Sequence, residues 1–190
     1  MKIYIFGGSF DPPHRGHLEI INRCKDACDL FILVPSSQSP LKKKLPSAND
    51  NHRIRMLNLF IKQSEKKIRI EDWELRQGGM SYTCDTVAYL KTRYPEEELF
   101  LLIGADQLDN FKNWKNPDEI LQNIQLIVFP REGFGNKIHA GIPFSRISDF
   151  NVRISSTLIR EKITSRNFPY ELLTPEIAEY IQQHHLYGLS

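Results

Sequence analysis

The sequence predicts an α/β domain with a mostly parallel sheet and helices on both faces. Segments with strand character and segments with helical periodicity alternate about five times, which is the pattern of parallel strands joined by crossover helices. Two strand segments, Leu30–Val34 and Leu99–Ile103, are continuously apolar, as expected for strands covered on both faces.

The chain begins with a strand over residues 2–6, which is rich in β-branched and aromatic side chains and ends at Gly7. Apolar residues at helical spacing predict a helix from about residue 16 to residue 25. The apolar strand 30–34 follows and ends at Pro35.

Residues 36–51 are mostly polar and predict a long loop, and loops of this length are often functional. Asp50 is a candidate N-cap for a helix over 51–63. A short strand is expected at 67–71, and the segment from 73 to 81 is expected to be irregular.

The second half repeats the alternation. A helix over 83–93 precedes the apolar strand 99–103, which ends at Gly104. Pro117 favours the first turn of a helix over 117–122, and a strand over 125–129 follows. The glycine-rich segment 131–141 is expected to be a loop.

The last elements are a short strand at 145–147 and helices over 156–164 and 175–184. No linker or internal repeat divides the chain. We therefore expect one Rossmann-like domain over residues 1–190, with functional groups at the carboxyl ends of the strands.

Composition excludes several classes of protein. The net charge of +2 gives no reason to expect nucleic acid or an acidic membrane as a partner. No apolar run approaches the roughly 18 residues of a membrane helix, and the N-terminal apolar segment is too short for a signal peptide. We expect a cytoplasmic protein, and a homo-oligomer is compatible with the sequence. The three cysteines do not form a disulfide framework.

The loop after the first strand carries the strongest functional signal. A glycine pair there allows close approach of a ligand to the backbone, and the following helix start favours an anion. His14 and His17 can donate hydrogen bonds to phosphate oxygens, more strongly when protonated. These residue types also allow a metal site made with Asp11, or a purely structural turn.

A second candidate phosphate site lies near the C-terminus, in the segment Ile154-Ser155-Ser156-Thr157-Leu158-Ile159-Arg160. Serine at a helix start caps the helix, and Ser156 and Arg160 share one helix face. The alternative is an ordinary helix start with an arginine one turn later.

Both segments resemble signatures of the nucleotidylyltransferase superfamily, G-x-F-D-P-x-H-x-G-H at Gly8–His17 and I-S-S-T-x-x-R at Ile154–Arg160. The resemblance implies that His14, His17 and Arg160 are catalytic and hold the ATP phosphates, and that Mg²⁺ is carried by those phosphates. The ATP-binding residues that it implies are Gly7, Gly8, Ser9, Phe10, His14, Gly16, His17, Gly104, Asp106, Ile154, Ser155, Ser156, Thr157 and Arg160.

The middle of the chain narrows the resemblance. Trp73-Glu74-Leu75-Arg76 and Ser81-Tyr82-Thr83-Cys84-Asp85-Thr86 resemble the E-x-x-R…S-Y-T-x-x-T block of bacterial nicotinate-mononucleotide adenylyltransferases, and the likeness extends over essentially the whole chain. It implies that ATP and nicotinate mononucleotide give deamido-NAD and pyrophosphate. The nicotinate carboxylate would bind backbone N–H groups at Tyr82 and Thr83, and Trp114 would stack on the pyridine ring.

Two positions, Lys42 and Asp106, leave alternatives open. The resemblance places Ser9 and Lys42 at the mononucleotide. The loop that carries Lys42 departs from the family pattern Pro-Pro-His-Lys, because Leu41 replaces the histidine. Lys42 or its lysine neighbours would supply the charge, unless they form only a solvated run. Asp106 suits ribose hydroxyls, and it also suits a helix N-cap.

Four other functions compete with this interpretation. The nearest are the same reaction on the amide mononucleotide and a phosphopantetheine adenylyltransferase. A nucleotide-binding module without catalysis is the third, and the intact His14, His17 and Arg160 argue against it. An RNA-binding protein is the fourth, and the near-neutral net charge argues against it.

Overall fold

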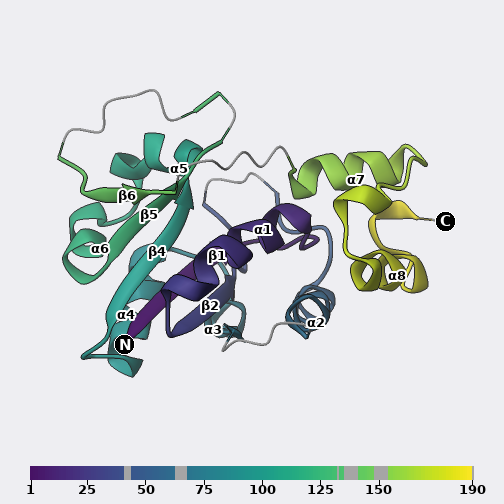
Figure 1. Ribbon diagram of the computed structural model, residues 1–190. Helices are drawn as coiled ribbons and strands as arrows, with labels where there is room; N and C mark the ends of the chain where they lie inside the picture. Colours follow the sequence, from purple (N-terminus) through teal and green to yellow (C-terminus); the bar gives the residue numbers. More distant parts are fainter. Residues whose placement is uncertain (41–43, 63–67, 132, 135–140, 148–153, 190) are drawn as a thin grey trace.

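A six-stranded parallel sheet forms the centre of the molecule (Figure 1). The structure, a computed structural model, describes residues 1–40, 44–62, 68–131, 133–134, 141–147 and 154–189. The strand order is β3-β2-β1-β4-β5-β6, and each of the five pairings is parallel. The strands are β1 Lys2–Gly8, β2 Leu30–Pro35, β3 Ile68–Ile70, β4 Glu98–Gly104, β5 Gln125–Phe129 and β6 Phe144–Arg146.

Helices cover both faces of this sheet. They are α1 Arg15–Cys24, α2 Asp50–Ile61, α3 Trp73–Gln77, α4 Thr83–Arg93, α5 Ala105–Asp109, α6 Pro117–Asn123, α7 Ser156–Thr164 and α8 Pro175–Gln183. Short 3₁₀ turns follow several of them, and one of these, η4 Leu186–Gly188, comes after α8. None of the described helices has both the length and the apolar character that a membrane crossing requires.

Alternation along the strands creates two apolar cores. In β1, Phe6 faces the core shared with α1, α2, α7 and α8, whereas Ile3 and Ile5 face the core shared with α4, α5 and α6. The continuously apolar segment Leu30–Val34 is buried throughout, and Leu99–Ile103 is buried except for the partly exposed Phe100, because each segment has side chains in both cores. In Figure 1, α7 and α8 lie to the right of the strands, on the same side as α2. The predicted fold class is therefore confirmed.

The structure corrects two predictions about local elements. Residues 73–77 form α3 within the segment expected to be irregular. The N-cap of α2 is Asn49 rather than Asp50, because the Asn49 side chain accepts the backbone N–H of His52 at 3.0 Å. Asp50 lies in the first turn of this helix, where a negative charge interacts favourably with the helix dipole.

The connections place a topological switch point between β1 and β4. After β1 the chain adds β2 and β3 on one side, and then crosses β1 to add β4 and β5 on the other. The loops leaving β1 and β4 therefore diverge at their carboxyl ends, which is where open α/β sheets form ligand-binding crevices.

Candidate functional site

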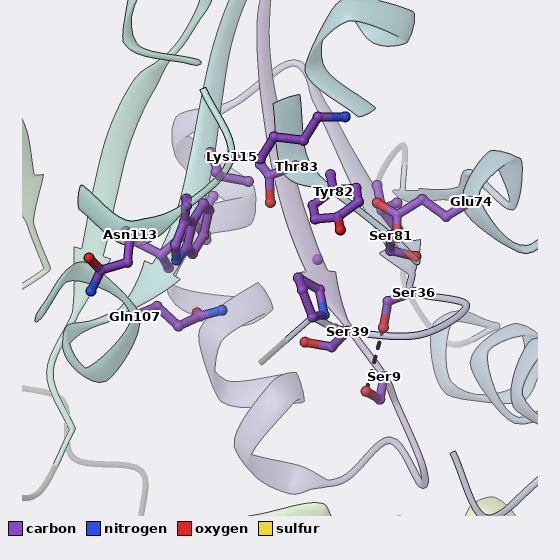
Figure 2. A pocket seen from close by; sticks show the side chains of 18 residues that line it. Ser9, Ser36, Ser39, Glu74, Ser81, Tyr82, Thr83, Gln107, Asn113 and Lys115 are labelled. Carbon is purple, nitrogen blue, oxygen red and sulfur yellow. Dashed lines mark hydrogen bonds between the residues drawn. The ribbon is translucent and has the colours of Figure 1, made fainter. Parts of the chain in front are cut away.

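A cavity of about 310 Å³ opens at this switch point. Figure 2 shows Ser81, Tyr82 and Thr83 on one side, with Gln107 and Asn113 on the other. The cavity is lined by Gly7, Gly8, Ser9, Val34, Ser36, Ser39, Pro40, Glu74, Ser81, Tyr82, Thr83, Leu101, Leu102, Ile103, Gln107, Asn113, Trp114 and Lys115. Four residues predicted at the mononucleotide, Ser9, Tyr82, Thr83 and Trp114, thus line one cavity, although they come from distant parts of the chain.

The start of α4 gives this cavity an anion-binding edge. Tyr82 is the N-cap and Thr83 the first helical residue, as the sequence predicts. The first-turn N–H groups of a helix lack intrahelical acceptors and carry the positive end of the helix dipole. Lys115 lies at this edge, with its Nζ 4.6 Å from the centre of the Tyr82 ring, and it neutralises the first-turn carboxylate of Asp85 through an ion pair of 3.0 Å.

Trp114 supplies a flat aromatic surface in the same cavity. Its ring packs against Phe111 with 5.1 Å between ring centres, at an angle of 45°. The indole Nε1 is buried and has no hydrogen-bond partner among the described residues. Buried indole N–H groups normally have a partner, so a bound ligand or a water is expected to supply one.

Glu74 is a cavity residue to which the sequence assigned no role. Its carboxylate accepts a hydrogen bond from the hydroxyl of Thr86. Burial raises the pKa of Glu74, while hydrogen bonds from Thr86 and Ser81 lower it in part. The Ser81 hydroxyl also accepts the backbone N–H of Ser37 at 2.9 Å. Glu74 and Ser81 therefore connect the start of α4 to the loop that leaves β2.

The two histidines of the first loop lie against each other. Their rings stack with 3.7 Å between centres, and the backbone N–H of His14 donates to Nδ1 of His17 at 3.2 Å. Because Nδ1 of His17 accepts this bond, the proton of the neutral His17 ring is on Nε2. The ring of Phe10 lies 4.9 Å from that of His17. Phe10 is itself buried in the core, so the ring of His17 packs against the core through Phe10.

His14 is a neutral group in this structure. Its residue is 3% exposed, and burial together with the positive charge of Arg131 lowers its pKa to about 3. The sequence had suggested stronger phosphate binding by protonated histidines, and for His14 the structure favours the uncharged ring. Its Nδ1 has no hydrogen-bond partner among the described residues.

The second motif docks directly on the first. Ser156 donates to the carbonyl oxygen of Pro12 at 2.9 Å, and Nη1 of Arg160 donates to that of Asp11 at 2.6 Å. Ser155 caps α7 by accepting the N–H of Leu158. The hydroxyl of Thr157 accepts from Arg160 at 3.4 Å. The structure thus brings Ser156 and Arg160 to the loop of His14 and His17, as the pairing of motifs predicts.

Two other residues predicted at the ATP site lie nearby in the fold. Ile154 packs against the adjoining core, and Gly16 is buried in the first turn of α1.

Asp11 is buried between these segments, with 2% of its surface exposed. Its carboxylate accepts the N–H groups of Ser47 at 2.7 Å and Ala48 at 3.0 Å, and the hydroxyl of Tyr187 at 2.9 Å. The oxygens of Asp11 are thus directed at donors within the protein, which argues against the alternative that joined Asp11 to the histidines as metal ligands.

Arg53 is a buried residue that the sequence analysis did not identify. It is fully buried, and its Nη1 donates to the carbonyl oxygens of Ser9 at 2.9 Å and Ser36 at 2.7 Å. It therefore joins the loops after β1 and β2. The buried stripe of α2 is Arg53, Met56, Leu57 and Phe60. In the sequence, Arg53 stands at helical spacing with these apolar residues, and this spacing could have predicted that the arginine is buried.

Gly104 and Asp106 lie at the end of β4. Gly104 is the N-cap of α5 and donates its N–H to Oε1 of Gln107 at 3.0 Å. The N-cap alternative for Asp106 is therefore wrong: Asp106 lies in the first turn, 3.5 Å from Nε of Arg131. Lys42 and Leu41 lie outside the described residues, and the neighbouring Lys44 is exposed.

Comparison with known proteins identifies the family. A family model described as cytidylyltransferase-like matches residues 5–162. The chain is 39% identical to a probable nicotinate-nucleotide adenylyltransferase of Bacillus pumilus, and 38% identical to the nicotinate-nucleotide adenylyltransferase of Bacillus subtilis. In each case the match covers 98% of both chains.

The fold also matches a solved structure. The Plasmodium falciparum nicotinic acid mononucleotide adenylyltransferase complexed with NaAD superposes with a TM-score of 0.85 at 22% identity, over 100% of this chain and 98% of that one. At this identity the likeness establishes the fold alone. The model match and the full-length relatives, together with the paired motifs, show that the chain belongs to the nicotinate-nucleotide adenylyltransferase family.

Proposed function

We propose that this protein transfers the adenylyl group of ATP to nicotinate mononucleotide, forming nicotinate adenine dinucleotide and pyrophosphate. The observation that carries the proposal is the docking of Ser156 and Arg160 on the Asp11-Pro12 loop, next to a cavity with an aromatic wall and a helix start. The proposed phosphate-binding region and the proposed site for a flat ring that carries a carboxylate thus share the glycines that end β1.

The proposed reaction is a direct displacement. An oxygen of the mononucleotide 5′-phosphate attacks the α-phosphorus of ATP, and the bond from this phosphorus to the oxygen bridging to the β-phosphate breaks. The electron pair leaves with pyrophosphate. No protein nucleophile is required, so catalysis rests on positioning and on stabilising charge.

The residues of the first loop would supply that stabilisation. His17, whose Nε2 carries the proton, would donate to the α-phosphate oxygen as charge develops. His14 and Arg160 would hold the β- and γ-phosphates, His14 as a neutral donor and Arg160 as a permanent cation. Gly7, Gly8 and Ser9 would allow close approach at the end of β1, and Asp106 would accept from ribose hydroxyls.

Magnesium is expected to arrive with ATP as part of the substrate. The side chains proposed here for the phosphates are imidazole and guanidinium groups, which donate hydrogen bonds and are not oxygen ligands. Mg²⁺ prefers oxygen and retains water, so phosphate oxygens and water fit this site as its ligands. Bound in that way, the ion would neutralise part of the phosphate charge.

The start of α4 favours the acid over the amide mononucleotide. N–H groups at Tyr82 and Thr83 would bind a carboxylate, and Trp114 would stack on the cationic pyridinium ring. The unpartnered indole N–H of Trp114 would reach an acceptor once the ligand is bound.

Pyrophosphate release with each mononucleotide, supplied with ATP and Mg²⁺, tests the proposal. We expect turnover with the acid and at least about tenfold lower kcat/KM with the amide, equivalent to about 1.4 kcal/mol. His17→Ala should lower kcat about 100- to 1000-fold, as loss of a charge-stabilising donor does, and circular dichroism should report an intact fold.

A matched control is His185→Asn, at an exposed histidine in left-handed conformation, which asparagine tolerates. It should keep normal turnover. ATP binding without pyrophosphate release would indicate a binding module, and near-normal turnover of His17→Ala would refute the proposed role of this histidine.

A further inference from the structure

Tyr187 connects the end of the chain to the first loop. It lies in η4, where its backbone has a φ of +62°, a conformation that costs energy for a tyrosine. Its hydroxyl donates to Oδ1 of Asp11 at 2.9 Å, across 176 sequence positions. Burial and the charge of Asp11 raise the pKa of Tyr187, so the hydroxyl keeps its proton and remains a donor throughout the working pH range.

The carboxylate of Asp11 accepts hydrogen bonds from three donors within the protein. Oδ1 of Asp11 is satisfied by Tyr187 and Ala48, and Oδ2 by Ser47. Nη1 of Arg160 lies 3.5 Å from Oδ2 and donates at 2.6 Å to the backbone carbonyl instead. The carboxylate therefore attracts the guanidinium without a short bond to it.

We propose that Tyr187 is a positioning residue for the ATP site, which acts through Asp11 to keep the guanidinium of Arg160 directed at the phosphates. This inference rests on the proposed function. Without the hydroxyl, Oδ1 loses one donor while buried, and a buried carboxylate requires compensating partners. Arg160, whose Nη1 lies 3.5 Å from Oδ2, would then turn further toward the carboxylate and away from the nucleotide.

The inference separates the two substrates. Tyr187 and Asp11 do not line the cavity that contains Tyr82, Thr83 and Trp114. A change at Tyr187 should therefore weaken the use of ATP and spare the mononucleotide, whereas general loss of structure would affect both substrates.

Tyr187→Phe in the full chain tests this, with Tyr170→Phe as the matched control. Tyr170 lies in the same C-terminal region and is exposed, and its hydroxyl accepts a hydrogen bond from the Gln182 side chain. For Tyr187→Phe we expect a roughly three- to tenfold rise in the KM for ATP, on the scale of one ordinary hydrogen bond. The KM for the mononucleotide should stay within about twofold, as both constants should in Tyr170→Phe.

A double-mutant cycle with Asp11→Asn tests the route of the effect. If Tyr187 acts through Asp11, the two changes in the KM for ATP should be strongly non-additive. Three results would overturn the inference: unchanged kinetics in Tyr187→Phe, a proportional loss of activity on both substrates with loss of folded protein, or additive effects in the cycle.

The comparison of Tyr187→Phe with Tyr170→Phe also remains informative if the proposed function fails. An inactive wild-type protein would refute adenylyl transfer, and the affinity for a non-hydrolysable ATP analogue, measured by calorimetry, would then test Tyr187 independently. Weaker binding in Tyr187→Phe but not in Tyr170→Phe would support the inference, and equal binding would refute it.

Discussion

Burial of His14 should make the stability of the protein depend on pH. The pKa of this histidine is lowered from 6.5 to about 3 in the folded state. As the pH falls through 6.5, the unfolded chain therefore binds a proton that the folded protein does not. The contribution of His14 is zero well above pH 7 and becomes destabilising below it. Linkage gives a slope approaching 1.36 kcal/mol per pH unit, which amounts to about 2 kcal/mol between pH 8 and pH 5.

Urea denaturation of the protein without nucleotide, followed by circular dichroism at several pH values, measures this effect. His14→Asn removes the titrating ring, so its free energy of unfolding should fall by about 2 kcal/mol less than that of the wild type over the same interval. His185→Asn removes an exposed histidine and should follow the wild-type profile. Parallel profiles for His14→Asn and the wild type would show that the folded protein tolerates a charged His14, which would refute the reasoning.

Two further predictions concern the loops around the site. Arg53→Met should lower the free energy of unfolding by about 2 to 5 kcal/mol, since the carbonyls of Ser9 and Ser36 lose a buried donor. The control Arg55→Met, on the exposed face of α2, should lower the free energy of unfolding by less than about 0.5 kcal/mol. Equal urea midpoints for the two variants would contradict the proposed role of Arg53. Gly104→Ala would place a Cβ 2.3 Å from Oδ1 of Asp106 and displace that carboxylate. We expect a higher KM for ATP with an unchanged KM for the mononucleotide in steady-state assays, and an unchanged KM for ATP would exclude Asp106 from the ATP site.

Much of the fold could be predicted because local signals mark its elements. The bounds of α4, β5 and α7 agree with the sequence predictions, since caps, prolines and continuous apolar runs define them. The helices α3 and α5 were missed because five residues each are too few for a helical period to be visible.

The site was predictable to the extent that it consists of contiguous motifs. The meeting of the His14 loop with Arg160 could be predicted because the family resemblance implies that the two motifs hold one ligand. The contacts of Asp11 with Tyr187, and of Arg53 with Ser9 and Ser36, are long-range hydrogen bonds between residues that carry no distinctive local pattern. Such contacts depend on how the elements pack and require a structure.

The central position of β1 has a consequence for how the protein reaches its native state. The first strand of the chain pairs with β2 on one edge and with Glu98–Gly104 on the other. The pairing of β1 with β4 joins residues that are distant in sequence. Such pairings form slowly, because the chain loses the entropy of the intervening loop before the new contacts stabilise it. During synthesis β1 leaves the ribosome long before β4, so the loop that carries His14 and His17 should be ordered among the last parts of the molecule. Folding intermediates are therefore expected to possess much of the sheet's secondary structure before they can bind a nucleotide.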